Sequence, residues 1–470
     1  RLKALSDARI TEARFTTERT LTTLPRLAVS ITTFKRETAV QNTVKRLESY
    51  LEDHEYKENI HIFVVDNGKS ADVSESPQTS YYPNDNLGGA GGFARGLQTA
   101  IKRDFTHVLF TDDDAAFPME SLHRSFVFLA LATDSRTAIA GAMINNTHKW
   151  AMWENGAWFD GSCHPMHCGT DLRNRDQVFG MEFDSARTQR PTLYGGWWFF
   201  AFAIDQVTHH PFPFFVRGDD ISFSLMNDFA ITTLNGVVSF QDDFSEKESA
   251  QTLYLDLRNH IIQHLVTPEL SRSALGTAKV PIRFVMRSLL RFHYESAEAQ
   301  LLAWEDVMRG PDFFDANIDM AQRRADIKAM MKTEVWEPLP DGPPPQRKRL
   351  TKWSRPWRTR LGIFTLNGHL VPFSRHRWDR VALPMADRGI VYPAFGAAQI
   401  TYLNATRNKA YTVTQSKRRF FAICRRMTGL LFRFLRSHDG LKASYSSGYD
   451  RLTTQQYWQA KTAPTASKAA

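Results

Sequence analysis

The sequence predicts an α/β protein with a mostly parallel central sheet. Two short β-branched runs, 27–34 (LAVSITTF) and 60–66 (IHIFVVD), flank the stretch 37–55, where apolar residues recur at helical spacing. Strand, helix and strand in this order form a βαβ unit, whose strands are parallel. A glycine-rich turn, a helix over 93–102 and a buried strand over 107–111 repeat the pattern. The loops that follow these strands are therefore expected at one edge of a single sheet.

The pattern continues along the chain and divides it into four parts. The runs 138–144 and 195–204 are predicted to be later strands of the sheet, and the periodicity becomes helical over 281–293 and 298–331. A proline-rich stretch, PLPDGPPP, marks a linker. The predicted parts are an N-terminal extension (1–25), the α/β domain (26–265), a helical region with the linker (266–345) and a basic C-terminal region (346–470).

The composition is that of a globular protein with anionic partners. Of the 470 residues, 42% are hydrophobic and 23% charged, which excludes a disordered or fibrous chain. Subtracting 50 acidic from 59 basic side chains leaves +9, which favours nucleotide diphosphates, nucleic acid or a membrane surface. Three cysteines cannot form a disulfide framework, which fits a reducing compartment. No apolar stretch approaches the roughly 18 residues of a membrane span.

Three consecutive carboxylates follow the predicted strand 107–111. Asp112, Asp113 and Asp114 stand where ligands bind in open α/β sheets, at the carboxyl end of a strand. Such carboxylates suit a hard divalent cation that is shared with substrate phosphates, whereas the alternative is an acidic, solvated loop. A second ligand-rich stretch, 163–168 (CHPMHC), lacks the spacing of zinc sites and is expected to be a loop.

A glycine-rich turn, 86–93 (NLGGAGGF), opens a predicted helix. Glycines let the backbone approach a phosphate or sugar closely, and a helix N-terminus favours anions. The spacing is neither G-x-G-x-x-G nor that of a P-loop, so a purely structural turn is the alternative. Asp66 ends the second strand, where a carboxylate commonly accepts hydrogen bonds from a ribose or base; a plain strand-end turn is the alternative there.

Two further stretches carry candidate groups for chemistry. Asp219 and Asp220 precede a helix-like stretch, and one of them is a candidate general base if Arg217 holds the other. The alternative is a solvated helix N-terminus, where Asp is favoured anyway. Trp197 and Trp198 follow two glycines. An indole face is a platform for a sugar ring, although isolated tryptophans more often belong to the core.

Taken together and in order, these stretches resemble the GT-A glycosyltransferases of family 2, and specifically the bacterial galactofuranosyltransferases. The resemblance covers 26–265 well and the remainder loosely, and it implies a GT-A (Rossmann-like) fold. The resembling stretches are 32–36 (TTFKR), 64–68 (VVDNG), 86–93 (NLGGAGGF), 110–114 (FTDDD), 153–157 (WENGA), 196–200 (GWWFF), 216–221 (VRGDDI), 257–259 (LRN) and 365–372 (TLNGHLVP).

The resemblance implies an inverting enzyme that uses a nucleotide-sugar donor, with UDP-galactofuranose expected, together with Mn2+ or Mg2+. Asp220 is the implied catalytic base, and Asp219 is the other member of the pair. The implied donor-binding residues are Thr32, Arg36, Asp66, Asn86, Gly88, Gly89, Asp112 and Asp113. The implied metal ligands are Asp112, Asp114 and Asp242, and the residues implied to line the sugar or acceptor are Glu154, Trp197 and Trp198.

The sequence departs from the family pattern in two places. Gln241 stands where relatives place a metal-binding histidine, so either Asp242 or Asp243 substitutes, or the donor and Asp114 hold the metal alone. Only about 25 residues precede the first strand, whereas chain-elongating relatives can carry a β-rich domain there. Addition of one or a few sugars in bacterial cell-surface polysaccharide synthesis is therefore expected, rather than processive polymerisation.

Other activities compete with this interpretation. A rhamnosyl- or other hexosyltransferase would keep every motif. A nucleotide-binding module without turnover would need the α/β domain alone, but such a module has no need for Asp220 in addition to the triplet at 112–114. Nucleic-acid binding is not expected, because the basic C-terminal region lacks a known binding motif.

The basic stretch 417–436 predicts a location for the protein. It contains seven Lys or Arg and no acidic residue, and its apolar residues recur at helical spacing. Such helices lie on anionic membrane surfaces, whereas the alternative is a helix packed on the protein with its arginines in water. The expected location is cytoplasmic, peripheral on the inner face of the cell membrane, where lipid-linked glycan acceptors lie. The apolar residues are Phe420, Ile423, Met427, Leu430, Leu431 and Phe434.

Overall fold

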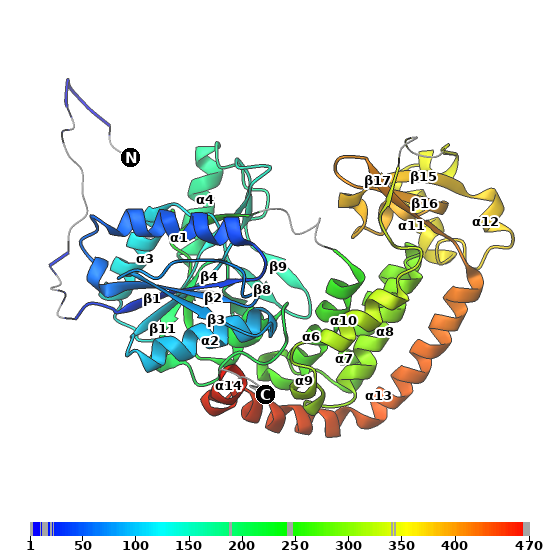
Figure 1. Ribbon diagram of the computed structural model, residues 1–470. Coiled ribbons are helices and arrows are strands. Elements are labelled where there is room, and N and C mark those ends of the chain that lie inside the picture. Colours follow the sequence, from blue (N-terminus) through cyan, green and yellow to red (C-terminus); the bar gives the residue numbers. More distant parts are fainter. Residues whose placement is uncertain are drawn as a thin grey trace.

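The computed structural model describes residues 3–9, 11, 17–18, 21, 23–187, 190–241, 248–339, 342 and 345–463. An α/β domain is followed by a helical bundle, a small β-sheet and a long helix that returns to the α/β domain (Figure 1). The predicted α/β class and the mostly parallel central sheet are confirmed.

The central sheet has the strand order β12-β5-β11-β4-β1-β2-β3. Neighbouring strands are parallel except β11, which runs antiparallel to β4 and β5. β1 lies between β2 and β4, and its register places Thr33 beside Asp66 and Thr32 beside Asp112. The ends of three parallel strands therefore meet at one edge. The strands are β1 (Leu27–Thr33), β2 (Ile60–Asp66), β3 (Thr79–Pro83), β4 (His107–Asp112), β5 (Thr137–Ala140), β11 (Phe200–Ala203) and β12 (Ala230–Thr232).

Alternate strand residues pack against helices on opposite faces of this sheet. Val29 and Ile31 share a core with α1 (Glu37–Leu51) and α3 (Met119–Leu131). Ala28 belongs to the core on the other face, with apolar residues of α2 (Gly88–Lys102) and α5 (Asp219–Met226). The predicted helix over 93–102 thus begins earlier, because the glycine-rich turn forms its first turn.

The predicted strand 138–144 is in fact two strands of different sheets. Gly141 separates β5 from β6 (Ala142–Asn145), which pairs with β7 (Met152–Glu154) and β13 (Val238–Gln241). The chain turns at Gly141, where a side chain would not fit. A Cβ built there would lie only 2.7 Å from the Cβ of Phe199. A third small sheet contains β8 (Ala157–Phe159), β9 (Cys163–Pro165) and β10 (Leu193–Tyr194), and α4 (Arg175–Ser185) lies between β9 and β10 in the chain.

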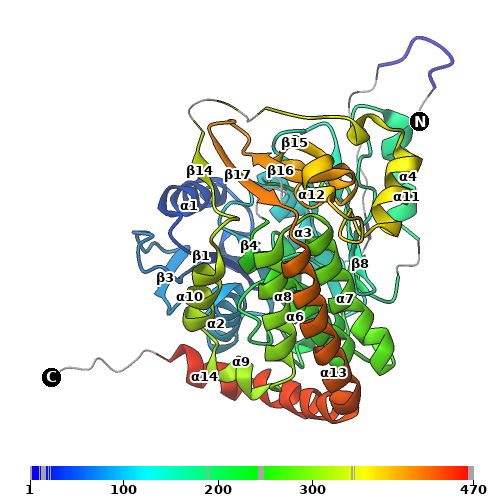
Figure 2. The ribbon, with the colours of Figure 1, turned by 90° about the vertical axis from the view of Figure 1, so that its right-hand side faces the viewer.

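The rest of the chain forms a helical bundle, where the sequence predicted a helical region, and a small sheet, which the sequence did not predict. The small sheet lies at the upper end of the bundle in Figure 2, and the two parts share one apolar core. The helices are α6 (Ala250–Val266), α7 (Ala274–Leu290), α8 (Tyr294–Val307), α9 (Asp312–Ala316), α10 (Ala321–Met330), α11 (Arg355–Phe364), α12 (Ser374–Arg377), α13 (Lys417–Leu452) and α14 (Gln455–Thr462). The sheet has the order β14 (Glu337–Pro338), β17 (Lys409–Thr414), β16 (Ala397–Leu403) and β15 (Asp379–Pro384).

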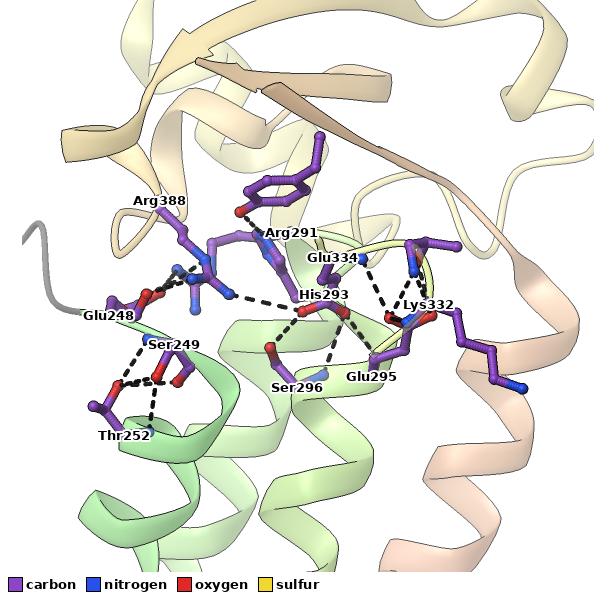
Figure 3. A network of polar contacts seen from close by, with 12 residues as sticks. Glu248, Ser249, Thr252, Arg291, His293, Glu295, Ser296, Lys332, Glu334 and Arg388 are labelled. Atoms are coloured by element: carbon purple, nitrogen blue, oxygen red, sulfur yellow. Dashed lines mark hydrogen bonds and ion pairs between the residues drawn. The ribbon is translucent and has the colours of Figure 1, made fainter. Parts of the chain in front are cut away.

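A buried polar network joins the bundle to the small sheet (Figure 3). Arg388, which is 4% exposed, lies 3.6 Å from Glu248 and 3.8 Å from Glu334. Arg291 contacts the same Glu248 at 3.4 Å, and Glu334 accepts a hydrogen bond from the backbone N–H of Ser296 at 3.2 Å. Because breaking a buried ion pair is strongly destabilising, these pairs fix how the two parts sit together.

The predicted amphipathic helix exists as the start of α13, but its apolar face is covered. Four of its predicted apolar residues are buried in the core of the helical bundle, and the two others pack against it. The alternative, a helix packed on the protein, is therefore what the structure has, and the expected membrane-binding face is corrected. Across the described ranges, no helix is both long and apolar enough to cross a membrane. The four buried residues are Phe420, Ile423, Leu430 and Phe434.

Candidate functional site

A cleft of about 440 Å³ opens where β1, β2 and β4 end and α2 begins. Its walls come from loops that are distant in sequence, brought together by the parallel register of the three strands. The arrangement follows the general rule for ligand sites in open α/β sheets. Eight predicted residues line the cleft: Thr32, Arg36, Asn86, Gly88, Gly89, Asp112, Asp113 and Asp114.

The glycine-rich turn packs tightly and also presents the start of α2 to the cleft. Gly88 has a positive φ of 72°, and a Cβ there would lie 2.0 Å from the carbonyl O of Phe215. That carbonyl accepts a hydrogen bond from the Ala90 N–H at 3.1 Å, and the side chain of Asn67 donates to Gly88 O at 2.9 Å. Only glycine fits at position 88, and the helix N-terminus behind it favours a negatively charged ligand.

The three carboxylates at 112–114 have two different roles: one orients an arginine, and the other two flank the cleft. Asp113 is 6% exposed and accepts hydrogen bonds from Thr33 Oγ1 at 2.7 Å and Arg36 Nη1 at 3.1 Å. Burial raises the pKa of Asp113, and the hydrogen bond from Thr33 and the charge of Arg36 offset part of that rise. The same guanidinium also contacts Asp114. Asp113 therefore orients Arg36, while Asp112 and Asp114 flank the cleft.

Asp112 and Asp114 fit a hard divalent cation that shares its coordination with phosphate oxygens, since such ions usually take only one or two carboxylates from the protein. Within the described ranges, no three His, Cys, Asp or Glu residues gather closely enough to hold a metal by themselves. The predicted third ligand, Asp242, and its neighbour Asp243 lie outside the described residues. Gln241 ends β13 and is 1% exposed.

Asp66 has a different role from the predicted one. Its side chain is fully buried, and its two oxygens accept hydrogen bonds from three backbone N–H groups and from Tyr81 Oη. These bonds shape the turn after β2, and Asn67 rather than Asp66 lines the cleft. The expectation that Asp66 holds the nucleoside is therefore corrected to a structural role. The three N–H donors belong to Gly68, Ser70 and Ala71.

Asp219 and Asp220 begin α5 and have different neighbours. A Cβ built on Gly89 would lie 3.3 Å from Asp219 Oδ2, so Asp219 is close to the first turn of α2. Burial, followed by the charges of Asp220 and Asp112, raises the pKa of Asp219 well above its usual value. Asp219 is therefore adjacent to the cleft, although Asp219 and Asp220 are not among the residues that line it.

The charge of Asp220 affects the ionisation of Glu154, at the end of β7. Burial raises the pKa of Asp220 to about 6, and the charge of Arg217 opposes that rise. Burial raises the pKa of Glu154 to about 8, with a further contribution from the charge of Asp220. At pH 7, Asp220 is thus mostly ionised and Glu154 is mostly protonated. Two carboxyl groups with separated pKa values are typical of an acid–base site.

The two tryptophans are not placed as a sugar platform. Trp197 and Trp198 are 5% and 9% exposed. The Trp197 ring packs against Phe93 and Phe110 at 4.9 and 5.3 Å between centroids, and Trp198 Nε1 donates to Gly141 O at 2.9 Å. Neither is among the described residues that line the cleft. Both belong to the core, so the expectation from the sequence is corrected.

Several residues of the site came from outside the predicted set. Arg324 of α10 and Gln251 of α6 line the cleft, so the helical bundle contributes a cation to it. Asn259 and Gln263 of α6 hold the turn before α5, because Asn259 Nδ2 donates to Val216 O at 3.0 Å and Gln263 Nε2 to Gly218 O at 2.8 Å. Of these four residues, only Asn259 lies in a stretch that the sequence analysis singled out, the LRN of 257–259.

Comparison with known proteins gives distant homologues. No protein-family model matches the chain. It is 22% identical over 489 aligned residues to galactofuranosyltransferase GlfT2 of Mycolicibacterium smegmatis, covering 92% of this chain and 71% of that protein. It is 23% identical over 325 residues to GlfT2 of Mycobacterium tuberculosis, covering 63% of this chain and 50% of that protein. The chain therefore spans between half and about seven tenths of the relatives that it matches.

Similar solved structures include a mannosyltransferase, PcManGT, from Pyrobaculum calidifontis, in complex with GDP-Man and Mn2+. It is 16% identical with a TM-score of 0.34, covering 66% of this chain and 83% of that one. Mannosyl-3-phosphoglycerate synthase from Rubrobacter xylanophilus is 13% identical with a TM-score of 0.33, covering 51% and 74%.

Proposed function

We propose that this chain, a glycosyltransferase homologous to the GlfT2 galactofuranosyltransferases, transfers galactofuranose from UDP-galactofuranose to a hydroxyl group of a glycan. The main support for this proposal is the position of Asp219 and Asp220. Asp219 lies close to Gly89, which lines the cleft together with Asp112 and Asp114, and Asp220 is the next residue of α5. A nucleotide-binding module without turnover would not need this second pair of carboxylates.

The cleft is suited to the diphosphate of a nucleotide sugar. Arg36 and Arg324 supply positive charge at its walls, and the N-terminus of α2, whose first residues Gly88 and Gly89 line the cleft, favours an anion. A divalent cation held by Asp112 and Asp114 would neutralise the charge that develops on the leaving diphosphate. Phe34 and Phe93 line the same cleft and provide apolar contacts. The acceptor then approaches from the side of Asp220 and Glu154.

The reaction that fits this geometry is a single displacement at the anomeric carbon. Asp220 accepts the proton of the acceptor hydroxyl as its oxygen attacks, the bond from the anomeric carbon to the diphosphate oxygen breaks, and the configuration inverts. Glu154, protonated at pH 7, does not compete with Asp220 for the proton, and we assign it the role of donating a hydrogen bond to the acceptor. No covalent enzyme intermediate is needed in an inverting reaction.

A rhamnosyl or another hexosyl donor would use the same cleft, so the donor sugar needs a test of its own. We expect UDP-galactofuranose to raise the melting temperature of the protein more than UDP-glucose, UDP-galactopyranose or dTDP-rhamnose at equal concentration. A ligand that binds the folded state in preference to the unfolded state raises the melting temperature, and tighter binding raises it further. A larger shift with dTDP-rhamnose would move the assignment to a rhamnosyltransferase.

The acceptor is proposed to be a lipid-linked glycan, which the protein would meet at a membrane surface. With the apolar face of α13 covered, the surface that fits this role lies on α11. Trp357 and Phe364, 60% and 79% exposed, are seven residues apart and share a helix face. Residues 346–436 contain 20 Lys or Arg and only two acidic residues, Asp379 and Asp387, the first of which is buried. Exposed aromatics among cations favour anionic lipid.

Replacing Trp357 and Phe364 with serine is expected to abolish salt-sensitive sedimentation with phosphatidylglycerol-containing liposomes. Phe179→Ser/Phe183→Ser is a matched control, because these residues are 51% and 72% exposed on α4 of the α/β domain. The control variant should sediment like the unchanged protein. Equal sedimentation of both double variants would contradict the proposed membrane surface.

A further inference from the structure

The last part of the chain, residues 449–462, lies against the α/β domain, and we call it the C-terminal segment. Figure 1 places α14 directly below α2. Arg95 and Gln98 of α2 donate hydrogen bonds to the carbonyl oxygens of Thr462 and Gln455 at 3.1 and 3.0 Å. The segment thus closes a long loop of chain, since α2 precedes it by more than 350 residues.

Tyr449 of this segment contacts the helix that carries the proposed base. Its hydroxyl lies 2.7 Å from Ser222 Oγ, and both side chains are fully buried. The ring also stacks on Phe212 with 5.2 Å between centroids. Ser222 follows Asp220 by two residues, in the first turns of α5. Because α5 has only eight residues, its orientation depends on tertiary contacts of this kind rather than on its own helical stability.

Trp458 of the same segment contacts the glycine-rich turn. Its indole is fully buried in one apolar cluster with Leu87 and Ala94, and its Nε1 donates to Pro211 O at 2.7 Å. Leu87 immediately precedes Gly88 and Gly89 of the cleft. A Cβ on Gly91 would lie 2.3 Å from Leu87 Cβ, so the turn has little room to shift.

We infer that the C-terminal segment is a positioning element of the active site. Tyr449 sets the orientation of α5 and thereby of Asp220, while Trp458 sets the position of the turn that receives the diphosphate. The inference rests on the proposed function, because it assigns these two elements to the base and to the donor. A misplacement of about 1 Å far from the reacting atoms is enough to lower turnover substantially, so the two contacts should affect different kinetic constants.

Tyr449→Phe tests the contact with α5. We expect kcat to fall by roughly 10-fold at an unchanged KM for the donor, because the base is misplaced while the cleft is intact. Tyr445→Phe is the matched control. Tyr445 lies one turn earlier on α13, is equally buried, and donates its own hydrogen bond at 2.8 Å to Val307 O inside the bundle. Loss of the Tyr445 hydroxyl should lower the melting temperature as much as loss of the Tyr449 hydroxyl, but should leave kcat within about 2-fold of the unchanged protein.

Trp458→Phe tests the contact with the glycine-rich turn. The KM for the donor should rise by roughly 10-fold with little change in kcat, because binding of the diphosphate is weakened. Trp304→Phe is the control, since Trp304 is also fully buried but packs on Phe434 within the bundle. Equal kinetic effects of each test variant and its control would reduce the segment to a general stabiliser and overturn the inference.

Hydrogen exchange separates this inference from the proposed function. In Tyr449→Phe, amides of 219–226 should exchange faster than in Tyr445→Phe, and in Trp458→Phe those of 87–95 should exchange faster than in Trp304→Phe. This result would support the coupling even if the protein transferred no sugar, in which case only the proposed function would fail. Unchanged exchange at both elements would contradict the coupling itself.

Discussion

Replacing Asp220 with asparagine is expected to lower kcat by about 10²–10⁴-fold and to leave the affinity for UDP unchanged. The amide keeps the size of the carboxylate and most of its hydrogen bonding, but it does not accept the proton of the acceptor hydroxyl. Initial rates and calorimetric titration with UDP measure the two quantities separately. If Asp219→Asn has this effect and Asp220→Asn does not, the base is the other member of the pair.

The pH dependence of the unchanged protein gives the same assignment an independent check. Since burial raises the pKa of Asp220 to about 6, kcat/KM should rise as the pH increases through 6 and Asp220 loses its proton. It should fall again above about 8, where Glu154 ionises beside Asp220. Asp256 is a useful control, because burial also raises its pKa to about 6. The pH profile of Asp256→Asn should still rise through pH 6. If that rise disappears in this variant, it is due to the ionisation of Asp256 and not of Asp220.

Replacing Asp114 with asparagine is expected to abolish turnover and to weaken UDP binding at the same time. If a divalent cation links this carboxylate to the diphosphate, loss of the carboxylate lowers the affinity for the cation and for the nucleotide together. EDTA should reproduce the effect in the unchanged protein, and Mn2+ should restore activity. Binding of UDP, followed by calorimetry with and without Mn2+, reports on the site without requiring turnover.

The control for this variant is Asp134→Asn, which removes an exposed carboxylate that pairs with Arg136 at 2.9 Å, away from the cleft. It should behave like the unchanged protein with and without EDTA. Full activity after exhaustive chelation would rule out the metal-dependent mechanism. An Asp114→Asn variant that still binds UDP with the same dependence on Mn2+ would show that the cation is held elsewhere.

Features set by local sequence pattern were predictable. β2 has the predicted bounds of 60–66, and the glycine-rich turn and the carboxylate triplet meet in one cleft because parallel strands end at one edge. The direction of a side chain at a strand end was not predictable. Asp66 points into its own turn, where three backbone N–H groups offer hydrogen bonds that no spacing rule reveals.

Features set by long-range packing were also beyond the sequence. The apolar face of α13 has the periodicity of a membrane-surface helix, yet the bundle covers it, and periodicity alone does not distinguish the two partners. Trp197 and Trp198 follow two glycines as a sugar platform might, but the core accommodates both rings. Arg324 reaches the cleft from a helix with no local motif, so only the folded chain identifies it.

The proposed transfer of galactofuranose to a glycan can be measured on the product itself. The most direct test incubates the protein with UDP-galactofuranose, Mn2+ and lipid-linked glycan acceptors, and identifies the product by mass and linkage analysis. We expect an acceptor that is heavier by hexose units in the furanose form, with inverted anomeric configuration, and no product from Asp220→Asn. Transfer of a different sugar from its own nucleotide donor, with no transfer from UDP-galactofuranose, would contradict the proposed function.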